Sequence, residues 1–166
     1  NSRIHAVLTS EESTERLLSR LQREVREKNF RGVDVDFEYI LKEDRDLFTA
    51  FVRELRVRMN EEGYLVSVAS APKTSAEQPG LLYEGKDYGG LGEAANQVLL
   101  MTYEWGYKYG PPMAVAPLNK VRQVVEYELT EIPSEKILLG VPNYGYDWIL
   151  PFMRGESQAV TIGHVE

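Results

Sequence analysis

The chain alternates between two hydrophobic patterns, and this alternation limits the folds that it can adopt. Apolar residues recur at three- and four-residue spacing in several segments, and short apolar runs lie between those segments. We expect helices over residues 11–29, 44–62, 88–96 and 116–132, and strands over residues 32–39, 64–70, 97–105 and 137–141. Strands and helices in strict alternation build a parallel sheet with helical crossovers. The sequence therefore predicts an α/β fold.

Short polar residues mark the expected ends of these helices. Ser10 or Thr9 is a candidate N-cap for the first helix, and Asp44 and Asp87 are candidates for the second and third. Gly63 should end the second helix, because glycine readily adopts the left-handed conformation found there.

The composition narrows the class of protein. The 166 residues fit one domain, and an apolar content of 43% is enough for a buried core. The net charge of -7 disfavours binding to nucleic acid or to an anionic membrane surface. Because the chain has no cysteine, disulfides and thiolate zinc sites are excluded. No apolar run approaches the roughly 20 residues that span a bilayer. We expect no signal peptide within the chain, so that any export would be directed by sequence outside it.

Polar and aromatic residues gather where the predicted strands end. Each strand end carries such a pair: Asp36 with Glu38, Ser67 with Ser70, Tyr103 with Glu104, and Asn143 with Tyr144. α/β barrels keep their active sites at the carboxyl ends of their parallel strands. Four strands cannot close an eight-stranded barrel. We therefore expect a partial (β/α)8 TIM barrel, about the middle four βα units, with residues 1–166 forming a fragment of one catalytic barrel.

The predicted strand over residues 32–39 carries a row of three carboxylates, Asp34, Asp36 and Glu38, with apolar residues between them. Side chains alternate faces along a strand, so the carboxylates share one face and the apolar residues share the other. Within a barrel, the acidic face would line the interior. Two interpretations without catalysis stay open at this point: a solvated acidic edge strand, and a divalent-metal cluster, since carboxylates bind magnesium or manganese.

The third interpretation of the row is acid–base catalysis. Neighbouring carboxylates in a confined site cannot all ionise freely, so one of them keeps a proton. Glu38 is nearest the open end and is the candidate general acid. Asp36 is placed to hold the shared proton or to orient the substrate, and Asp34 lies deeper and tunes the charge.

Three segments resemble the strand motifs of glycoside hydrolase family 18, the chitinase-like (β/α)8 barrels. GVDVDFE is similar to the motif DxxDxDxE, LLMTYEW to Met-x-Tyr-Asp, and LLGVPNYGYDW to Gly-Val-Pro-x-Tyr-Gly. They follow the family's order and span most of the chain. The segment MTYEWGYKYGPPMAVAPLNKVRQVVEY resembles the spore-associated branch, which contains cortex peptidoglycan N-acetylglucosaminidases and sporulation-specific glycosylases. Members of that branch often carry wall-binding modules, so we expect such modules elsewhere in the parent chain.

The resemblance implies a substrate-assisted mechanism, which is an exception to the usual scheme of two catalytic carboxylates. The 2-acetamido carbonyl of the sugar attacks its own anomeric carbon, and water then opens the cyclic ion with retention. By the match, Glu38 protonates the leaving oxygen and then activates water. Asp36 holds the acetamido N–H and Asp34 supports Asp36, while Tyr103 hydrogen-bonds the acetamido group. The resemblance implies no cofactor and no metal.

The chain departs from the family pattern at two positions. Arg31 stands where the first motif has aspartate, a supporting position, and Glu104 stands where the later motif has aspartate, which lengthens the charged arm. Aromatic faces suit sugar rings, although loop packing would also account for the aromatic residues near the later strand ends. The candidate substrate-binding residues are Glu104, Trp105, Asn143 and Tyr144.

The sequence and the resemblance together predict a retaining glycosidase that cleaves N-acetylglucosamine linkages in spore cortex peptidoglycan. A chitinase and a catalytically inactive, sugar-binding chitinase-like protein are the alternatives. The expected partner is an N-acetylated glycan, with neither nucleic acid nor membrane involved. The expected location is extracytoplasmic, in the spore coat, the cortex or the cell wall. We expect His5 and His164 to be surface residues.

Overall fold

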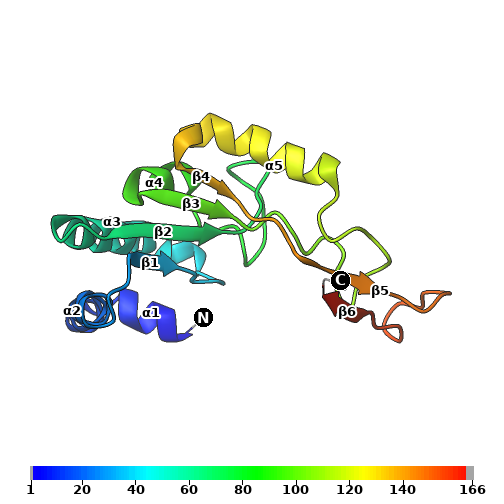
Figure 1. Cartoon of the computed structure of the whole chain (residues 1–166), viewed down its shortest axis with the longest axis horizontal. Coiled ribbons are helices and arrows are strands. Elements are labelled where there is room, and N and C mark those ends of the chain that lie inside the picture. The colour runs from blue at the N-terminus through cyan, green and yellow to red at the C-terminus, as the bar shows by residue number, and fades with distance from the viewer. Residues whose placement is uncertain (1, 164–166) are drawn as a thin grey trace.

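The computed structural model describes residues 2–163, and its centre is a four-stranded parallel sheet (Figure 1). The strands lie side by side in chain order and are β1 (Gly32–Val35), β2 (Leu65–Ser70), β3 (Gln97–Leu100) and β4 (Ile137–Leu139). Every neighbouring pair in this sheet is parallel. The predicted α/β fold is therefore confirmed, whereas its membership of an eight-stranded barrel stays a prediction.

Helices precede and connect the strands. They are α1 (Ser2–Leu8), α2 (Glu11–Glu27), α3 (Arg45–Glu61), α4 (Tyr88–Ala94) and α5 (Leu118–Glu131), with short 3₁₀ turns at Lys42–Asp44 and Ser134–Lys136. Four of these helices match the sequence prediction, and α1 is additional because seven residues give too little periodicity to recognise. None of the helices within residues 2–163 is long and apolar enough to cross a membrane.

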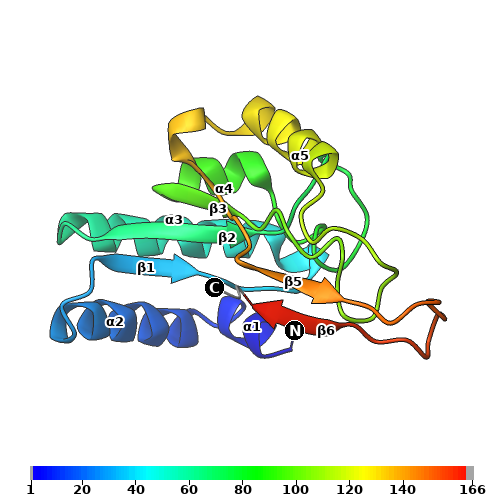
Figure 2. The same cartoon turned by 45° about the vertical axis from the view of Figure 1, so that its right-hand side comes forward.

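The hydrophobic core lies between the sheet and the helices, and α3 runs along β2 (Figure 2). Burial alternates along β3 and along the first four residues of β2, as one helix-covered face requires. The fully buried apolar residues of β2, β3 and α3 are Val66, Val68, Val98, Leu100, Phe48, Val52, Leu55 and Met59. Burial of each large apolar side chain stabilises the fold by about 1.5–3 kcal/mol. This packing fixes the positions at which the strands end.

Two predicted helix ends are confirmed by their hydrogen bonds. The Ser10 hydroxyl accepts the backbone N–H of Ser13 at 3.2 Å, which makes Ser10 the N-cap of α2. Gly63 has a φ of 82° and follows α3, as expected for a left-handed terminating glycine. Its N–H donates to the carbonyl of Asn60, and the next N–H in the chain donates to that of Met59, which completes a Schellman motif.

The predicted N-cap positions of Asp44 and Asp87 are confirmed, but their side chains do not cap the helices. Both occupy N-cap positions, of α3 and α4 respectively, but neither makes a side-chain capping hydrogen bond. The buried carboxylate of Asp44 instead accepts a hydrogen bond from His5 Nδ1 of α1 at 2.9 Å. His5 is 44% exposed, so the predicted surface histidine has a structural partner 39 residues away in the chain. His164 lies outside the described residues.

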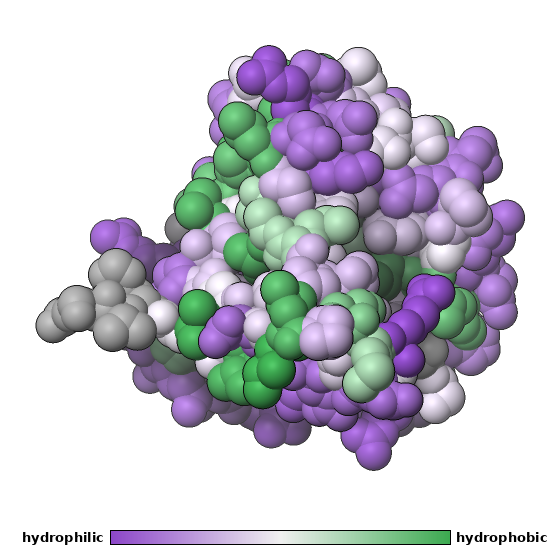
Figure 3. Space-filling model, turned by 90° about the vertical axis from the view of Figure 1, so that its right-hand side faces the viewer, coloured by the Kyte–Doolittle hydropathy of each residue, from purple (hydrophilic) through white to green (hydrophobic). Residues whose placement is uncertain are grey.

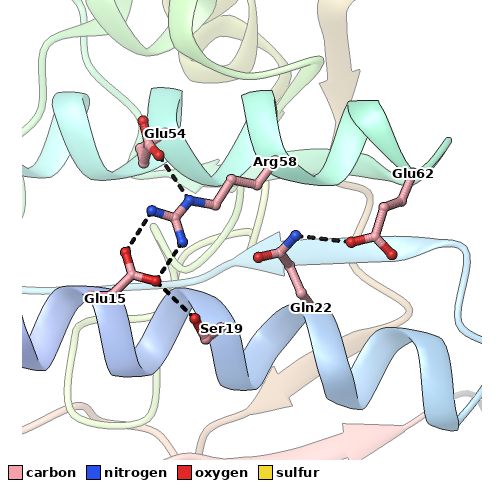
Figure 4. A network of polar contacts seen from close by, with 6 residues as sticks. All are labelled: Glu15, Ser19, Gln22, Glu54, Arg58 and Glu62. Atoms are coloured by element: carbon pink, nitrogen blue, oxygen red, sulfur yellow. Dashed lines mark hydrogen bonds and ion pairs between the residues drawn. The ribbon is translucent and has the colours of Figure 1, made fainter.

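Charged side chains join α2 to α3 on their outer surfaces (Figure 4). Arg58 of α3 donates to Glu15 of α2 at 2.6 Å and to Glu54 of its own helix at 2.8 Å. Further along the two helices, Gln22 Nε2 of α2 donates to Glu62 at 2.9 Å. Exposed ion pairs of this kind contribute about 0–1 kcal/mol each, so they help to align the helices rather than to hold the fold.

Two strands end earlier than predicted. β1 stops at Val35 rather than at residue 39, and β3 stops at Leu100 rather than at residue 105. Beyond them, Tyr39 and Glu104 adopt left-handed φ angles of 57° and 67°, which an extended strand does not allow. Left-handed non-glycine residues cluster at functional sites, because the surrounding structure must hold them there. The chain therefore leaves the sheet at the positions that carry the candidate site.

A two-stranded antiparallel ribbon, which the sequence did not predict, follows β4. It consists of β5 (Tyr144–Asp147) and β6 (Val160–Gly163). It projects beyond the carboxyl ends of the parallel strands (Figures 1 and 2). The four residues of β6 alternate apolar and polar side chains but are all exposed, and so short a run does not identify a strand by its pattern.

Candidate active site

The three predicted carboxylates lie in a row at the carboxyl end of β1, and all of them are exposed. Asp34 belongs to β1 itself, and Asp36 and Glu38 follow the strand. Asp34 Oδ1 accepts a hydrogen bond of 2.5 Å from the hydroxyl of Ser67. Ser67 is the register partner of Asp34 on β2, so the sheet places the donor beside the acid.

Phe37 anchors the segment that carries Asp36 and Glu38. Phe37 packs against the core, where its ring stacks on Phe48 at 6.0 Å and on Phe51 at 5.8 Å between ring centroids. Both partner rings belong to α3. Because Asp36 and Glu38 flank this anchor, their backbone is fixed although it lies outside the strand.

A cavity of about 190 Å³ lies at the carboxyl ends of the strands. It is lined by Glu38, Ala71, Pro72, Leu82, Tyr83, Met101, Tyr103, Glu104 and Trp105. The structure thus brings together four of the predicted site residues. Asp34 and Asp36 are not part of the lining. Their influence on the cavity is electrostatic, because their negative charges contribute to the raised pKa of Tyr103.

Tyr103 presents a protonated hydroxyl to this site. Burial raises the pKa of Tyr103, and the negative charges of Asp36 and Glu38 raise it further. Its ring lies against Gly140, which follows β4: a Cβ there would come within 2.8 Å of the Tyr103 ring. The ring is therefore held in place by a position that only glycine fits, and the phenol remains a hydrogen-bond donor.

Glu104 is clamped by two tyrosines of β5. Its Oε1 accepts from the hydroxyl of Tyr144 at 2.5 Å and from that of Tyr146 at 2.8 Å. The pKa of Tyr144 is raised by burial and then by its hydrogen bond to Glu104, and the same kind of hydrogen bond is the main cause of the raised pKa of Tyr146. These two hydrogen bonds tie β5 to the segment that follows β3. They also orient the carboxylate of Glu104, which stands where the family motif has aspartate.

The remaining predicted binding residues have different positions. Trp105 lines the cavity, and its backbone N–H donates to the carbonyl of Val115 at 3.1 Å. Tyr144 reaches the site through Glu104. Asn143 is exposed and does not line the cavity, so the structure does not bring it into the group.

Two interpretations without catalysis were open for the carboxylate row: a solvated acidic edge strand and a divalent-metal cluster. The row is solvated along β1, which is an edge strand among the described residues. Glu38 nevertheless faces a cavity that it shares with Tyr103, which a plain solvated edge does not require. Within residues 2–163 no three His, Cys, Asp or Glu side chains are grouped to hold a metal ion.

Three residues around the site were not predicted as members of it. Tyr83 lines the cavity and Tyr146 binds Glu104. Lys86 is buried beside the row, and its amine donates to the carbonyl of Ala69 at 2.6 Å. Tyr146 follows Tyr144 by two residues, and this alternation was the available signal. Lys86 belongs to a polar stretch, YEGKDY, that gives no sign of burial.

A parallel α/β sheet with carboxylates and aromatic side chains at its carboxyl end is typical of TIM-barrel glycosidases. The family model of glycosyl hydrolases family 18 matches residues 1–158. The chain belongs to this family.

Several relatives resemble the chain over most of its length. The cortical fragment-lytic enzyme of Bacillus subtilis (strain 168) is 47% identical over 153 residues, which cover 92% of this chain and 36% of that protein. The crystal structure of the Bacillus cereus spore cortex-lytic enzyme SleL matches with a TM-score of 0.92 and 32% identity, over 96% of this chain and 37% of that one. The SleL structure from Bacillus megaterium QM B1551 matches with a TM-score of 0.89 and 43% identity, over 95% and 36%. The chain thus spans about a third of the length of these relatives.

Proposed function

We propose that this chain supplies the acid–base machinery of a retaining glycosidase that cleaves N-acetylglucosamine linkages in spore cortex peptidoglycan. The observation that carries the proposal is the shared cavity of Glu38 and Tyr103 at the carboxyl ends of the strands. Family membership and the cortex-lytic names of similar proteins support the choice of substrate.

In this proposal the substrate's own acetamido group is the nucleophile. Glu38 gives its proton to the leaving oxygen and afterwards takes a proton from the attacking water. Asp36 holds the acetamido N–H and balances the positive charge of the cyclic intermediate. Asp34, itself held by Ser67, supports Asp36. The raised pKa of Tyr103 keeps its phenol available as a donor to the acetamido oxygen.

We further propose that the four-stranded sheet is the middle part of a (β/α)8 barrel. Among the described residues, β1 and β4 each have one neighbouring strand, so each exposes one edge. Leu138, Leu139 and Val141 at the β4 side are 39%, 47% and 80% exposed. Unpaired edges with exposed apolar residues are liabilities that proteins normally cover. Further strands of the same domain would cover these edges. In addition, Figure 3 shows hydrophobic side chains open to solvent at the end to which the strands point.

The location and the other partners follow from the same proposal. A cortex glycan lies outside the cytoplasm, so the enzyme acts in the spore coat, the cortex or the cell wall. Wall-binding modules elsewhere in the parent protein would hold it on this insoluble substrate.

The test uses the full-length protein on purified spore-cortex peptidoglycan, with mass spectrometry of the released fragments. The proposal expects fragments that end in a new N-acetylglucosamine reducing end, lost in Glu38→Gln and kept in the matched variant Glu43→Gln, whose side chain is exposed and outside the cavity. Cleavage of chitin oligomers alone would indicate a chitinase. Binding without any turnover would indicate a sugar-binding protein.

A further inference from the structure

A second cavity adjoins the cavity of the candidate active site. This second cavity, here called the side pocket, has a volume of about 410 Å³ and lies between the loop over residues 72–79 and the α5 residues 120–124. Pro72, Tyr83 and Trp105 line both cavities. Because the two cavities share these three residues, a branched or oligomeric ligand bound in the first has the side pocket within reach.

The two aromatic residues between the cavities are held by local backbone contacts. The Tyr83 ring lies over Gly80, which has a φ of 128°, and a Cβ on Gly80 would come within 3.0 Å of that ring. The backbone N–H of Trp105 donates to the carbonyl of Val115 at 3.1 Å, and its side chain packs against the core. Aromatic side chains offer flat apolar area with a polar handle, which suits a sugar ring. The wall between the cavities is therefore a surface that a glycan can cross.

On one side, the side pocket is bounded by a polar loop that its own glutamine holds together. The backbone N–H and the hydroxyl of Thr74 donate to Gln78 Oε1 at 2.8 Å and 3.2 Å. Gln78 Nε2 donates in turn to the carbonyl of Pro72 at 3.4 Å. Ser75 also lines the side pocket, and its hydroxyl makes no hydrogen bond to another residue within 2–163. The loop thus presents a free hydroxyl to the side pocket.

On the other side, α5 contributes an exposed positive charge. Lys120 and Gln123 lie three residues apart, so they share one face of the helix, above the buried Val124. Neither the Lys120 ammonium nor the Gln123 amide has a partner in the described part of the chain. None of the acidic residues in that part lines the side pocket, whereas Glu38 and Glu104 line the neighbouring cavity. In a chain of net charge -7, the side pocket therefore holds a cation without a counter-charge.

We propose that the side pocket binds a carboxylate on a branch of the glycan: the lactyl acid of a muramic residue, or the peptide stem that extends from it. The Lys120 ammonium supplies the charge partner, and the Ser75 hydroxyl and the Gln123 amide supply further donors. Hydrogen bonds to an ionised group are stronger than those between neutral groups. Oligomers of N-acetylglucosamine carry no such branch. This inference rests on the proposed function and names the contact by which the site selects cortex glycan over chitin.

The first experiment measures glycan binding by calorimetry in the full-length protein with Glu38→Gln, so that the ligand stays intact. The ligands are an alternating tetrasaccharide of N-acetylglucosamine and N-acetylmuramic acid and the neutral tetramer of N-acetylglucosamine. Adding Lys120→Gln should raise the Kd of the acidic tetrasaccharide about fivefold, the scale of an exposed charge pair, and that of the neutral one less than twofold. Equal effects on the two ligands, or none on the acidic one, would overturn the inference.

The matched control is Arg122→Gln. Arg122 is exposed on the same helix but does not line the side pocket, so this variant removes the same charge without changing the pocket. It should leave the Kd of both ligands at the parent value, and Lys120→Arg, which keeps the charge, should retain the parent's preference. A loss in Arg122→Gln equal to that in Lys120→Gln would indicate general attraction by the protein surface and would contradict a specific site.

A second set of ligands separates the two sources of the carboxylate. Tetrasaccharides with bare lactyl acids are compared with tetrasaccharides that carry peptide stems. An effect of Lys120→Gln on the bare acid assigns the contact to the lactyl group, an effect confined to the peptide-bearing ligand assigns it to the stem, and an effect on neither contradicts the inference. If the parent binds acidic glycan through Lys120 but cleaves none, the proposed function alone fails. If it cleaves cortex glycan and Lys120→Gln binds like the parent, this inference alone fails.

Discussion

The two faces of the segment over residues 33–38 have opposite environments. On one face, Val35 is buried and Phe37 stacks on two rings of α3. On the other, Asp34, Asp36 and Glu38 remain exposed at the end of the sheet that holds the cavity. The difference teaches that neighbouring residues in this segment have separate tasks: the odd positions pack against the core, and the even positions stay open for the chemistry that we propose.

The largest effect on the packed face is expected for Phe37→Ala. Removing the ring should lower the free energy of unfolding by about 3 kcal/mol, since both stacking contacts and the buried area are lost. Chemical denaturation measures it. Phe30, which is 53% exposed, supplies the control, and Phe30→Ala should cost less than about 1 kcal/mol. Equal losses in the two variants would break the comparison between the faces.

A second prediction concerns a buried carboxylate that lies on α5 and outside the carboxylate row. Glu128 of α5 is fully buried, and neither of its carboxylate oxygens has a hydrogen-bond partner among residues 2–163. Burial raises the pKa of Glu128 to about 8, and the charge of Glu131 adds to this rise.

Because the folded-state pKa of Glu128 is above its unfolded value, stability should fall as the pH rises from about 4.5 through 8. Glu128→Gln should remove this loss, as measured by denaturation at pH 5 and pH 9. The exposed Glu126 on the same helix is the control, and Glu126→Gln should retain the parent's slope. An unchanged slope in Glu128→Gln would contradict this prediction, because it would show that folding does not raise the pKa of Glu128.

On the open face, the tyrosine clamp on Glu104 should have a moderate effect. Tyr144→Phe removes the hydrogen bond of 2.5 Å to Glu104, and a hydrogen bond is typically worth about 1 kcal/mol, so kcat/KM should fall about fivefold. Steady-state kinetics on cortex glycan tests this. Tyr109, which is 60% exposed, is the matched control. If Tyr109→Phe reduced kcat/KM equally, Glu104 would have no special place in the site.

The smallest effect is expected at the outer pairs between α2 and α3. The hydrogen bond from Arg58 holds the pKa of Glu15 at about 2. Because that pKa is lowered, the contribution of this pair to stability is present above about pH 4.5 and is lost as the pH falls towards 2. Arg58→Met should flatten the acid dependence of the melting temperature slightly, whereas Arg53→Met, on the same helix, should leave it unchanged. High salt should weaken the same dependence in the parent.

Local patterns predicted most of the scaffold. Periodicity located α2, α3 and α5 and the order of the four parallel strands, and alternation placed the carboxylates on one face. These features depend on residues close together in the chain, which a sequence pattern records directly.

The features that the sequence did not reveal depend on contacts between distant segments. β1 and β3 end at Val35 and Leu100 although apolar residues continue the strand pattern, and left-handed residues follow at Tyr39 and Glu104. The partner of Asp44 is a histidine of α1, and Lys86 is buried where its stretch docks onto Ile40 and its amine reaches the carbonyl of Ala69. No spacing rule within one segment contains that information.

The central claim is that Glu38 performs acid–base chemistry without contributing to the packed core. Turnover of cortex glycan and the free energy of unfolding should therefore be measured on the same preparation of Glu38→Gln. We expect kcat/KM to fall by at least about 100-fold, with the free energy of unfolding within about 0.5 kcal/mol of the parent. A folded variant that keeps the parent's turnover would contradict the account.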